Sequence, residues 1–125
     1  MTDKPNLLLI TTDTQRCDTL NCMGYPHAIS PNLDRLASEG VMFTQAHTSA
    51  PVCFPARSCL ITGLHTPIHG AIENGTTRLS HFPTLPDLLK AEGYRNLMIG
   101  KSHFSPIPDT FDAVIEKEYD NYLVE

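Results

Sequence analysis

The sequence lacks an excess of basic residues, which bears directly on the kind of partner it can bind. Its 125 residues carry 9 Lys and Arg against 14 Asp and Glu, a formal net charge of −5. A domain that binds nucleic acid normally presents a strongly basic face, so this charge argues against that class. We therefore expect no nucleic-acid partner.

The sequence also lacks a long hydrophobic run. The apolar stretch near the N-terminus covers only Leu7 to Ile10. A membrane-spanning helix needs about 20 apolar residues, and a secretory signal needs a basic start and a longer apolar segment than this one. These features predict no membrane partner and a cytoplasmic location.

A cysteine-rich pattern is missing as well. The four cysteines are Cys17, Cys22, Cys53 and Cys59. They show neither the density of a disulfide scaffold nor the paired C-x2-C spacing of a zinc site, so we expect reduced thiols, with Cys59 in the core. His65 and His69 have the i, i+4 spacing of a metal pair, but the intervening Pro67 argues against the regular helix that such a pair requires.

What the sequence does contain is an alternation of strand and helix patterns. Residues 6–12 (NLLLITT) form a continuous apolar run typical of a strand buried on both faces, and Asp13 follows at its carboxyl end. The further predicted elements are helices at 30–40, 55–64 and 84–93 and strands at 41–46 and 94–100. Leucines at helical spacing give the first and last of these helices an apolar face. This order predicts an α/β fold, with a mainly parallel sheet flanked by helices.

Two segments stand outside this alternation. Residues 65–77 have little periodicity and are expected to form a long surface loop, which in a compact domain is often functional. Residues 109–125 carry six acids against one base, whereas residues 1–108 carry eight of each, so the whole net charge lies in this acidic tail. We expect the tail to be a solvated helix or loop.

The motif Cys53-Phe54-Pro55-Ala56-Arg57 stands at the start of a predicted helix. Helix N-termini attract anions, and the guanidinium of Arg57 suits a tetrahedral oxyanion. The spacing C-x3-R differs from the C-x5-R loop of cysteine phosphatases. Taken singly, Cys53 is also compatible with a small buried apolar residue, and Asp13 with a turn or cap.

The sequence around this motif resembles the type I, formylglycine-dependent sulfatases of the alkaline-phosphatase-like superfamily. The resemblance covers residues 5–105 and several motifs in the right order: LLLITTD, SPNLDRLASEGVMFTQAH, CFPAR, TGLHTPIHG, and TLPDLLKAEGYRNLMIGKSH with its terminal G-K-x-H. It implies an alkaline-phosphatase-like fold. Because such enzymes are several times longer, residues 1–125 are expected to be the N-terminal part of a sulfatase catalytic domain, incomplete without the remainder of that domain.

The resemblance also implies a chemistry. A separate formylglycine-generating enzyme would oxidise Cys53 to an aldehyde, whose hydrate attacks the sulfur of a small-molecule sulfate ester while bound to a divalent cation. The alcohol leaves, and the second hydroxyl of the hydrate then expels sulfate and restores the aldehyde. A serine would lack that second hydroxyl and stay trapped as an ester.

The resemblance implies roles for individual residues. Asp13 and the modified Cys53 would hold the cation, with Ca²⁺ favoured over Mg²⁺. Arg57 would stabilise the nucleophile, and Lys101 and His103 would contact the sulfate group and the hydrate. Asn74 would contact substrate. Many relatives have two successive aspartates where this chain has Thr12-Asp13, which removes one carboxylate from the cation.

Two other interpretations stay open. One is a phosphonate or phosphate monoester hydrolase of the same superfamily, which would use the same nucleophile; the Lys101/His103 pair favours sulfate esters instead. The other is an inactive fragment or binding module in which Cys53 remains a thiol. Because no further metal ligands match the family pattern after residue 103, we expect residues 1–125 alone to be unable to turn over substrate.

Overall fold

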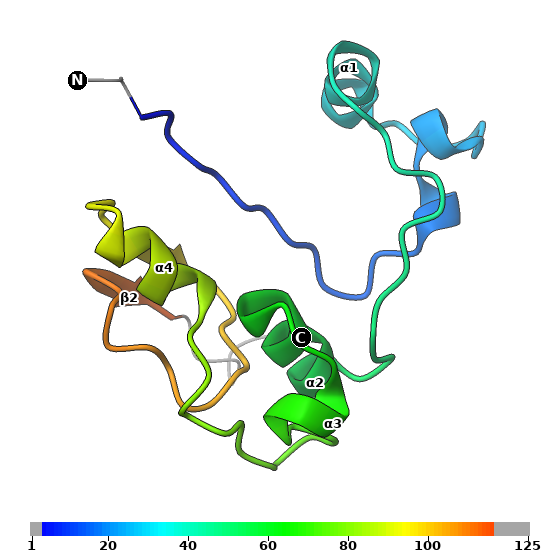
Figure 1. The fold of residues 1–125 in the computed structure, drawn as a ribbon. Helices are drawn as coiled ribbons and strands as arrows, with labels where there is room; N and C mark the ends of the chain where they lie inside the picture. Colours follow the sequence, from blue (N-terminus) through cyan, green and yellow to red (C-terminus); the bar gives the residue numbers. More distant parts are fainter. Residues whose placement is uncertain (1–3, 117–125) are drawn as a thin grey trace, which may run out of the picture. The chain divides into compact units, whose positions relative to one another are not determined.

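The computed structural model describes residues 4–116, which fall into two compact units, residues 4–46 and residues 47–116. Figure 1 shows the course of the chain through both. The first unit contains the short 3-10 helices η1 (Cys17–Thr19) and η2 (Asn21–Met23) and helix α1 (Pro31–Glu39). The second contains helices α2 (Cys53–Thr62), α3 (Thr66–His69) and α4 (Leu85–Ala91) and strands β1 (Leu97–Ile99) and β2 (Ala113–Ile115).

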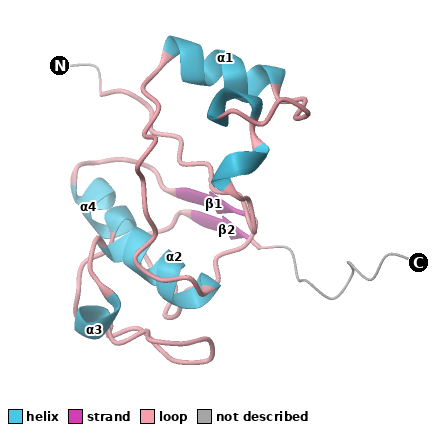
Figure 2. Ribbon diagram, turned by 90° about the vertical axis from the view of Figure 1, so that its right-hand side faces the viewer, coloured by secondary structure: helices cyan, strands magenta, loops and turns pink. Residues whose placement is uncertain are grey.

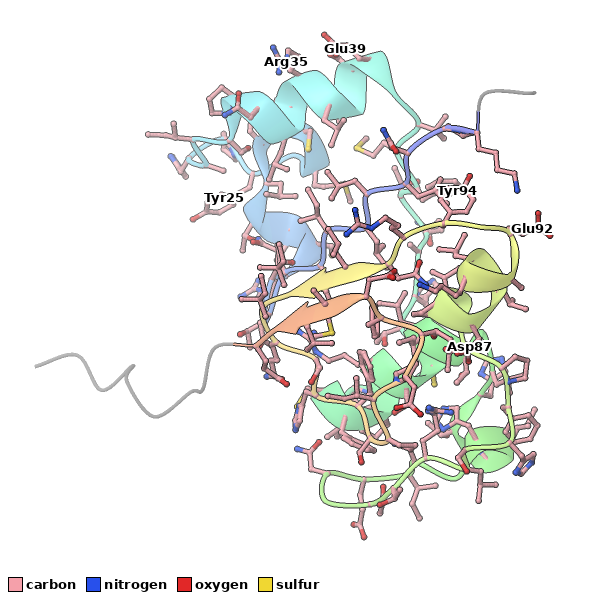
Figure 3. The ribbon with its side chains drawn as sticks, turned by 90° about the vertical axis from the view of Figure 1, so that its left-hand side faces the viewer. Tyr25, Arg35, Glu39, Asp87, Glu92 and Tyr94 are labelled. Atoms are coloured by element: carbon pink, nitrogen blue, oxygen red, sulfur yellow. The ribbon has the colours of Figure 1, made fainter. Side chains whose placement is uncertain are left out.

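Helix α1 of the first unit confirms the helix predicted at 30–40. Pro31 occupies its first turn, where a missing N–H costs nothing, and Gly40 follows its last residue. Its predicted apolar face is not buried, because the side chains of Leu33 and Leu36 are 45% and 65% exposed. Figure 3 shows the charged Arg35 and Glu39 extending outward from the same helix.

The strands predicted at 6–12 and 41–46 are wrong for this structure. Both segments are irregular chain, and Leu8 and Phe43 within them are 85% and 77% exposed. A strand exists only where a neighbouring strand accepts and donates its backbone hydrogen bonds. Within residues 4–46 of the described chain neither segment finds such a neighbour, so apolar pattern alone does not produce a strand.

Helix α2 is the buried helix of the second unit. It begins at Cys53, two residues earlier than predicted, and ends at Gly63, whose φ of +68° is the left-handed conformation that glycine adopts most easily. Its core residues are Phe54, Pro55, Ser58, Cys59 and Ile61. The burial of Cys59, with 8% of its surface exposed, confirms the predicted core position.

Helix α4 and the sheet complete the second unit (Figure 2). Helix α4 confirms the prediction at 84–93, with the backbone N–H of Thr84 donating to Asp87 Oδ2 at 2.7 Å at its start. Its predicted apolar face is only partly covered, because Leu85 and Leu88 are 42% and 57% exposed. Strand β1 lies inside the predicted strand 94–100 and pairs in parallel with β2, in the register Leu97–Ala113 to Ile99–Ile115. The predicted α/β class with parallel strand pairing is confirmed.

Part of the acidic tail is structured, against expectation. Residues 113–115 form strand β2, and Asp112 just before it accepts the backbone N–H of Asn96 at 2.7 Å and pairs with Lys90. The many acids in this segment led us to overlook the three apolar residues Ala113, Val114 and Ile115, which form the strand. The remainder of the predicted tail, residues 117–125, lies outside the described residues.

Candidate active site

The residue at position 53 lies at the mouth of helix α2. Cys53 is the first helical residue, half-buried, with a free thiol. The Oδ1 atom of Asn74 accepts a hydrogen bond from the Phe54 N–H at 3.2 Å and lies 3.6 Å from Cys53 Sγ. Asn74 therefore caps α2 from 20 residues downstream and places its amide beside the residue-53 side chain.

Arg57 lies one turn further along α2 and connects the helix to the end of strand β1. Its Nη1 donates a hydrogen bond to the backbone oxygen of Lys101 at 2.6 Å. The guanidinium is half-buried, so this bond forms partly out of water. Helix α2 and the G-K-x-H segment, 44 residues apart in the sequence, thus meet through the arginine of one motif and the lysine of the other.

His103 lies against the first turn of α2. Its ring packs edge-on against Phe54, with centroids 5.8 Å apart and ring planes at 80°. The backbone of His103 has a φ of +44°, in the left-handed region that is uncommon for a residue with a side chain. Such conformations persist where the surroundings impose them, and they are concentrated at functional sites.

A pocket of about 480 Å³ opens beside these residues. Its lining consists of Phe54, Lys101, Ser102, His103, Phe104, Ser105 and Glu116. Of the predicted residues in this unit, Lys101 and His103 line the pocket, whereas Cys53, Arg57 and Asn74 do not. Hydrogen bonds and the Phe54–His103 ring contact connect the helix start, the loop and the strand end that carry the five residues. The chemical roles of these five residues remain predictions.

Asp13, the predicted cation ligand, belongs to the first unit. It is exposed and follows the irregular segment 6–12, and Thr14 after it has a φ of +57°. Among the described residues, no group of three or more His, Cys, Asp or Glu side chains is arranged to hold a metal ion. The cation site at Asp13 and residue 53 therefore remains a prediction.

Of the two histidines considered as a metal pair, His65 and His69, the second is a buried core residue. Helix α3 forms despite Pro67, within the segment that we predicted to be a loop, and it buries His69 completely. The Ala71 N–H donates to His69 Nδ1 at 3.1 Å, so the ring proton is on Nε2, which lies 3.2 Å from Cys59 Sγ. Burial lowers the pKa of His69, which keeps the ring neutral in the core.

Sequence reasoning missed Ser102 and Glu116. The N–H and Oγ of Ser102 both donate to Glu116 Oε1, at 3.0 and 2.6 Å. The bond from the Ser102 hydroxyl is the main reason that the pKa of Glu116 falls below its usual value. Glu116 was counted as part of a solvated tail, and no local sequence signal links it to a residue 14 positions earlier.

Comparison with known proteins is consistent with this geometry. The chain is 28% identical to the phosphonate monoester hydrolase of Agrobacterium radiobacter, whose crystal structure it matches with a TM-score of 0.87 over 93% of this chain and 26% of that one. This agreement assigns the chain to the α/β fold of alkaline-phosphatase-like hydrolases.

The family is defined by sequence. The sulfatase family matches residues 5–123. The chain is 33% identical over 111 residues to N-acetylglucosamine-6-O-sulfatase of Bacteroides thetaiotaomicron, covering 89% of this chain and 20% of the relative. It is 34% identical over 128 residues to N-acetylgalactosamine-6-sulfatase of Sus scrofa, covering 86% and 24%. The chain belongs to the sulfatase family and spans about a fifth to a quarter of the length of these relatives.

No helix within residues 4–116 has the length and apolar character needed to cross a membrane.

Proposed function

We propose that this chain supplies the nucleophile side of a sulfatase active site, which hydrolyses a small-molecule sulfate ester. The observation that carries the proposal is the convergence on one helix mouth: Asn74 contacts residue 53 directly, and Arg57 reaches the lysine of the G-K-x-H segment. Cys53 and Arg57 belong to the CFPAR motif, Lys101 to the G-K-x-H segment, and Asn74 to the loop between them.

The surroundings of residue 53 fit its conversion to formylglycine. The side chain lies beside the Asn74 carbonyl, a hydrogen-bond acceptor that favours a hydroxyl-bearing group over a thiol, because O–H is the stronger donor. A divalent cation would be held by Asp13 together with the oxygens of the modified residue, a hard oxygen donor set that suits Ca²⁺ or Mg²⁺, and the family resemblance favours Ca²⁺. When bound, the cation would lower the pKa of the attacking hydroxyl and polarise the ester.

The chain's own residues would act on substrate as follows. Lys101 would bind a sulfate oxygen, and Arg57 would stabilise negative charge near residue 53. The imidazole of His103 would hold and return the proton of the residue-53 hydroxyl, because its ring lies against the first turn of α2. Asn74 would orient that hydroxyl through Oδ1.

Two partners follow from this proposal. A formylglycine-generating enzyme would have to act on Cys53 before the site matures, and the remainder of a sulfatase catalytic domain would supply further cation ligands. The curated relatives, which are four to five times longer than their match with this chain, support the second partner. Residues 1–125 would then be the N-terminal part of that domain.

A second candidate is hydrolysis of phosphonate or phosphate monoesters. The specific observation in its favour is the TM-score of 0.87 to a phosphonate monoester hydrolase. The Lys101/His103 pair favours sulfate esters, and the named relatives with 33% and 34% identity are sulfatases. A third reading, an inactive fragment or binding module, would keep Cys53 as a thiol.

Substrate turnover distinguishes these candidates. The protein containing this chain, expressed in a host that makes formylglycine, is assayed on an aryl sulfate and on a phenyl phosphonate monoester. We expect the sulfate ester to have the larger kcat/KM, and Cys53→Ala to remove activity on both. A larger kcat/KM on the phosphonate would favour the second candidate, and no turnover of either would favour the third.

A further inference from the structure

We propose that Glu116 is a positioning residue that fixes the segment from Lys101 to His103, and with it the two side chains that act on the sulfate group. The inference rests on the function proposed above, and it assigns a part of the site that neither the motifs nor the family comparison identifies.

The first observation is the pair of bonds to Ser102. Its backbone N–H and its hydroxyl both donate to one oxygen of Glu116, at 3.0 and 2.6 Å. Ser102 is only 4% exposed, so these two donors need a protein acceptor. Because Ser102 lies between Lys101 and His103 in the chain, a shift of its backbone moves both neighbours.

The second observation is continuity with the sheet. Ile99 pairs with Ile115, and the Gly100 N–H donates to the Ile115 backbone oxygen at 2.8 Å. The next donor along this side, Ser102, is taken by the side chain of Glu116 rather than by backbone. The carboxylate therefore continues the contact between the two segments beyond the last paired residues.

The third observation is that the segment is held from its other side by α2. Arg57 binds the Lys101 carbonyl at 2.6 Å, and Phe54 packs against the His103 ring. The left-handed backbone at His103 is an uncommon conformation that surrounding contacts must maintain. Glu116 is exposed enough to line the pocket, and its bonds to Ser102 are charge-assisted, which makes them stronger than neutral ones.

Variants of Glu116 distinguish the effect of its hydrogen-bond acceptor from the effect of its negative charge. Glu116→Ala removes the acceptor, whereas Glu116→Gln keeps an oxygen in its place without the charge. Ser102→Ala removes one of the two donors. Asp109→Asn is the matched control, because Asp109 is an exposed acid seven residues before Glu116. Each variant is made in the protein containing this chain and assayed for kcat and KM on an aryl sulfate.

We expect Glu116→Ala to lower kcat by about 10- to 100-fold, since small displacements of groups that act on substrate have effects of that size. Glu116→Gln should recover most of the loss, Ser102→Ala should fall between them, and Asp109→Asn should match the wild type. Hydrogen exchange at the amides of residues 100–104 should be faster in Glu116→Ala than in Asp109→Asn.

Two results would overturn the inference: Glu116→Ala equal to the control in both kcat and exchange, or Glu116→Ala with a lowered kcat but with exchange at residues 100–104 equal to the control, because the loss would then not come from displacement of this segment. If Glu116→Ala fails to fold, the kcat and exchange of Ser102→Ala decide the question. A wild-type protein without sulfatase activity, but with exchange at 100–104 that responds to Glu116→Ala, would refute the proposed function and support the positioning role.

Discussion

The two units use the same kind of hydrogen bond for different ends. In the first, the carboxylate of Asp34 accepts the Cys22 N–H at 2.9 Å and the Ser30 hydroxyl at 3.1 Å, and it ties α1 to the segment before it. In the second, the amide of Asn74 accepts the Phe54 N–H and also faces the side chain at position 53. Asp34 only holds two segments of the chain together, whereas Asn74 also lies beside a candidate nucleophile.

Whether a capping hydrogen bond can affect catalysis depends on the residues beside it. Asp34 is surrounded by donors that belong to local turns, and these bonds lower its pKa although burial works in the opposite direction. The side chain of Asn74 instead contacts Cys53 and Phe54, about 20 residues earlier in the chain. Activity should therefore depend on the contacts around α2 in the second unit and not on those around α1 in the first.

The largest effect should come from the side chain at position 53. Cys53→Ser removes the thiol that is oxidised to formylglycine and leaves a single hydroxyl, so steady-state turnover should fall by about 10³-fold or more. Turnover and covalent labelling on an aryl sulfate measure this. If the Cys53→Ser variant kept the wild-type steady-state turnover, the proposed release step would be wrong.

The next effect should come from Arg57. Arg57→Ala removes both the bond to the Lys101 carbonyl and the positive charge beside residue 53, and we expect kcat/KM to fall by about 10²- to 10³-fold. Arg35→Ala, a change of the same residue type on the exposed side of α1, is the control in the first unit. If Arg35→Ala lowered kcat/KM as much as Arg57→Ala, activity would not depend specifically on the second unit's contacts.

The capping comparison itself is tested by Asn74→Ala and Asp34→Ala. Each removes a side-chain acceptor of a backbone N–H, so each should lower the melting temperature, measured by thermal melts. Only Asn74→Ala should also lower kcat, by about tenfold. The comparison would break if Asp34→Ala impaired kcat as much.

The smallest effect concerns acid stability in the second unit. Hydrogen bonds from Thr84 and Thr110 outweigh burial and lower the pKa of Asp87, which is labelled at the start of α4 in Figure 3. A carboxylate with a lowered pKa stabilises the fold fully above its unfolded pKa of about 3.9 and loses that contribution as pH falls through the folded value.

Asp87→Asn should therefore lower the melting temperature most near neutral pH, at a cost of about 1–2 kcal/mol, because one of the accepted bonds is lost. The difference from the wild type should shrink below about pH 4. Melting temperatures of both proteins between pH 3 and pH 7 measure this. A difference that grew toward low pH would show that the sign is wrong.

The sequence predicted the helices better than the strands, and the reason is physical. Helix signals such as Pro31, Gly63 and the Thr84/Asp87 pair act within a few residues, so a pattern suffices. A strand depends on its neighbour. Residues 6–12 carry a clear strand pattern and are irregular here, whereas the unrecognised β2 forms because it pairs with β1.

The candidate site shows the same limit. The motif residues Cys53, Arg57, Lys101 and His103 could be named from the sequence, because each lies in a short recognisable pattern. Ser102 and Glu116 could not, because their bonds join segments 14 residues apart through a side chain that looked like part of an acidic tail. Contacts of that kind become visible only when the strands are paired.

If residue 53 becomes an oxygen nucleophile, the mass of the peptide that contains it must change. A proteolytic peptide spanning position 53, taken from protein made in a host with the modifying enzyme, should be about 18 Da lighter than the unmodified sequence, the difference between cysteine and formylglycine. A peptide with the unmodified cysteine mass, in protein that nevertheless cleaves aryl sulfates, would contradict the account.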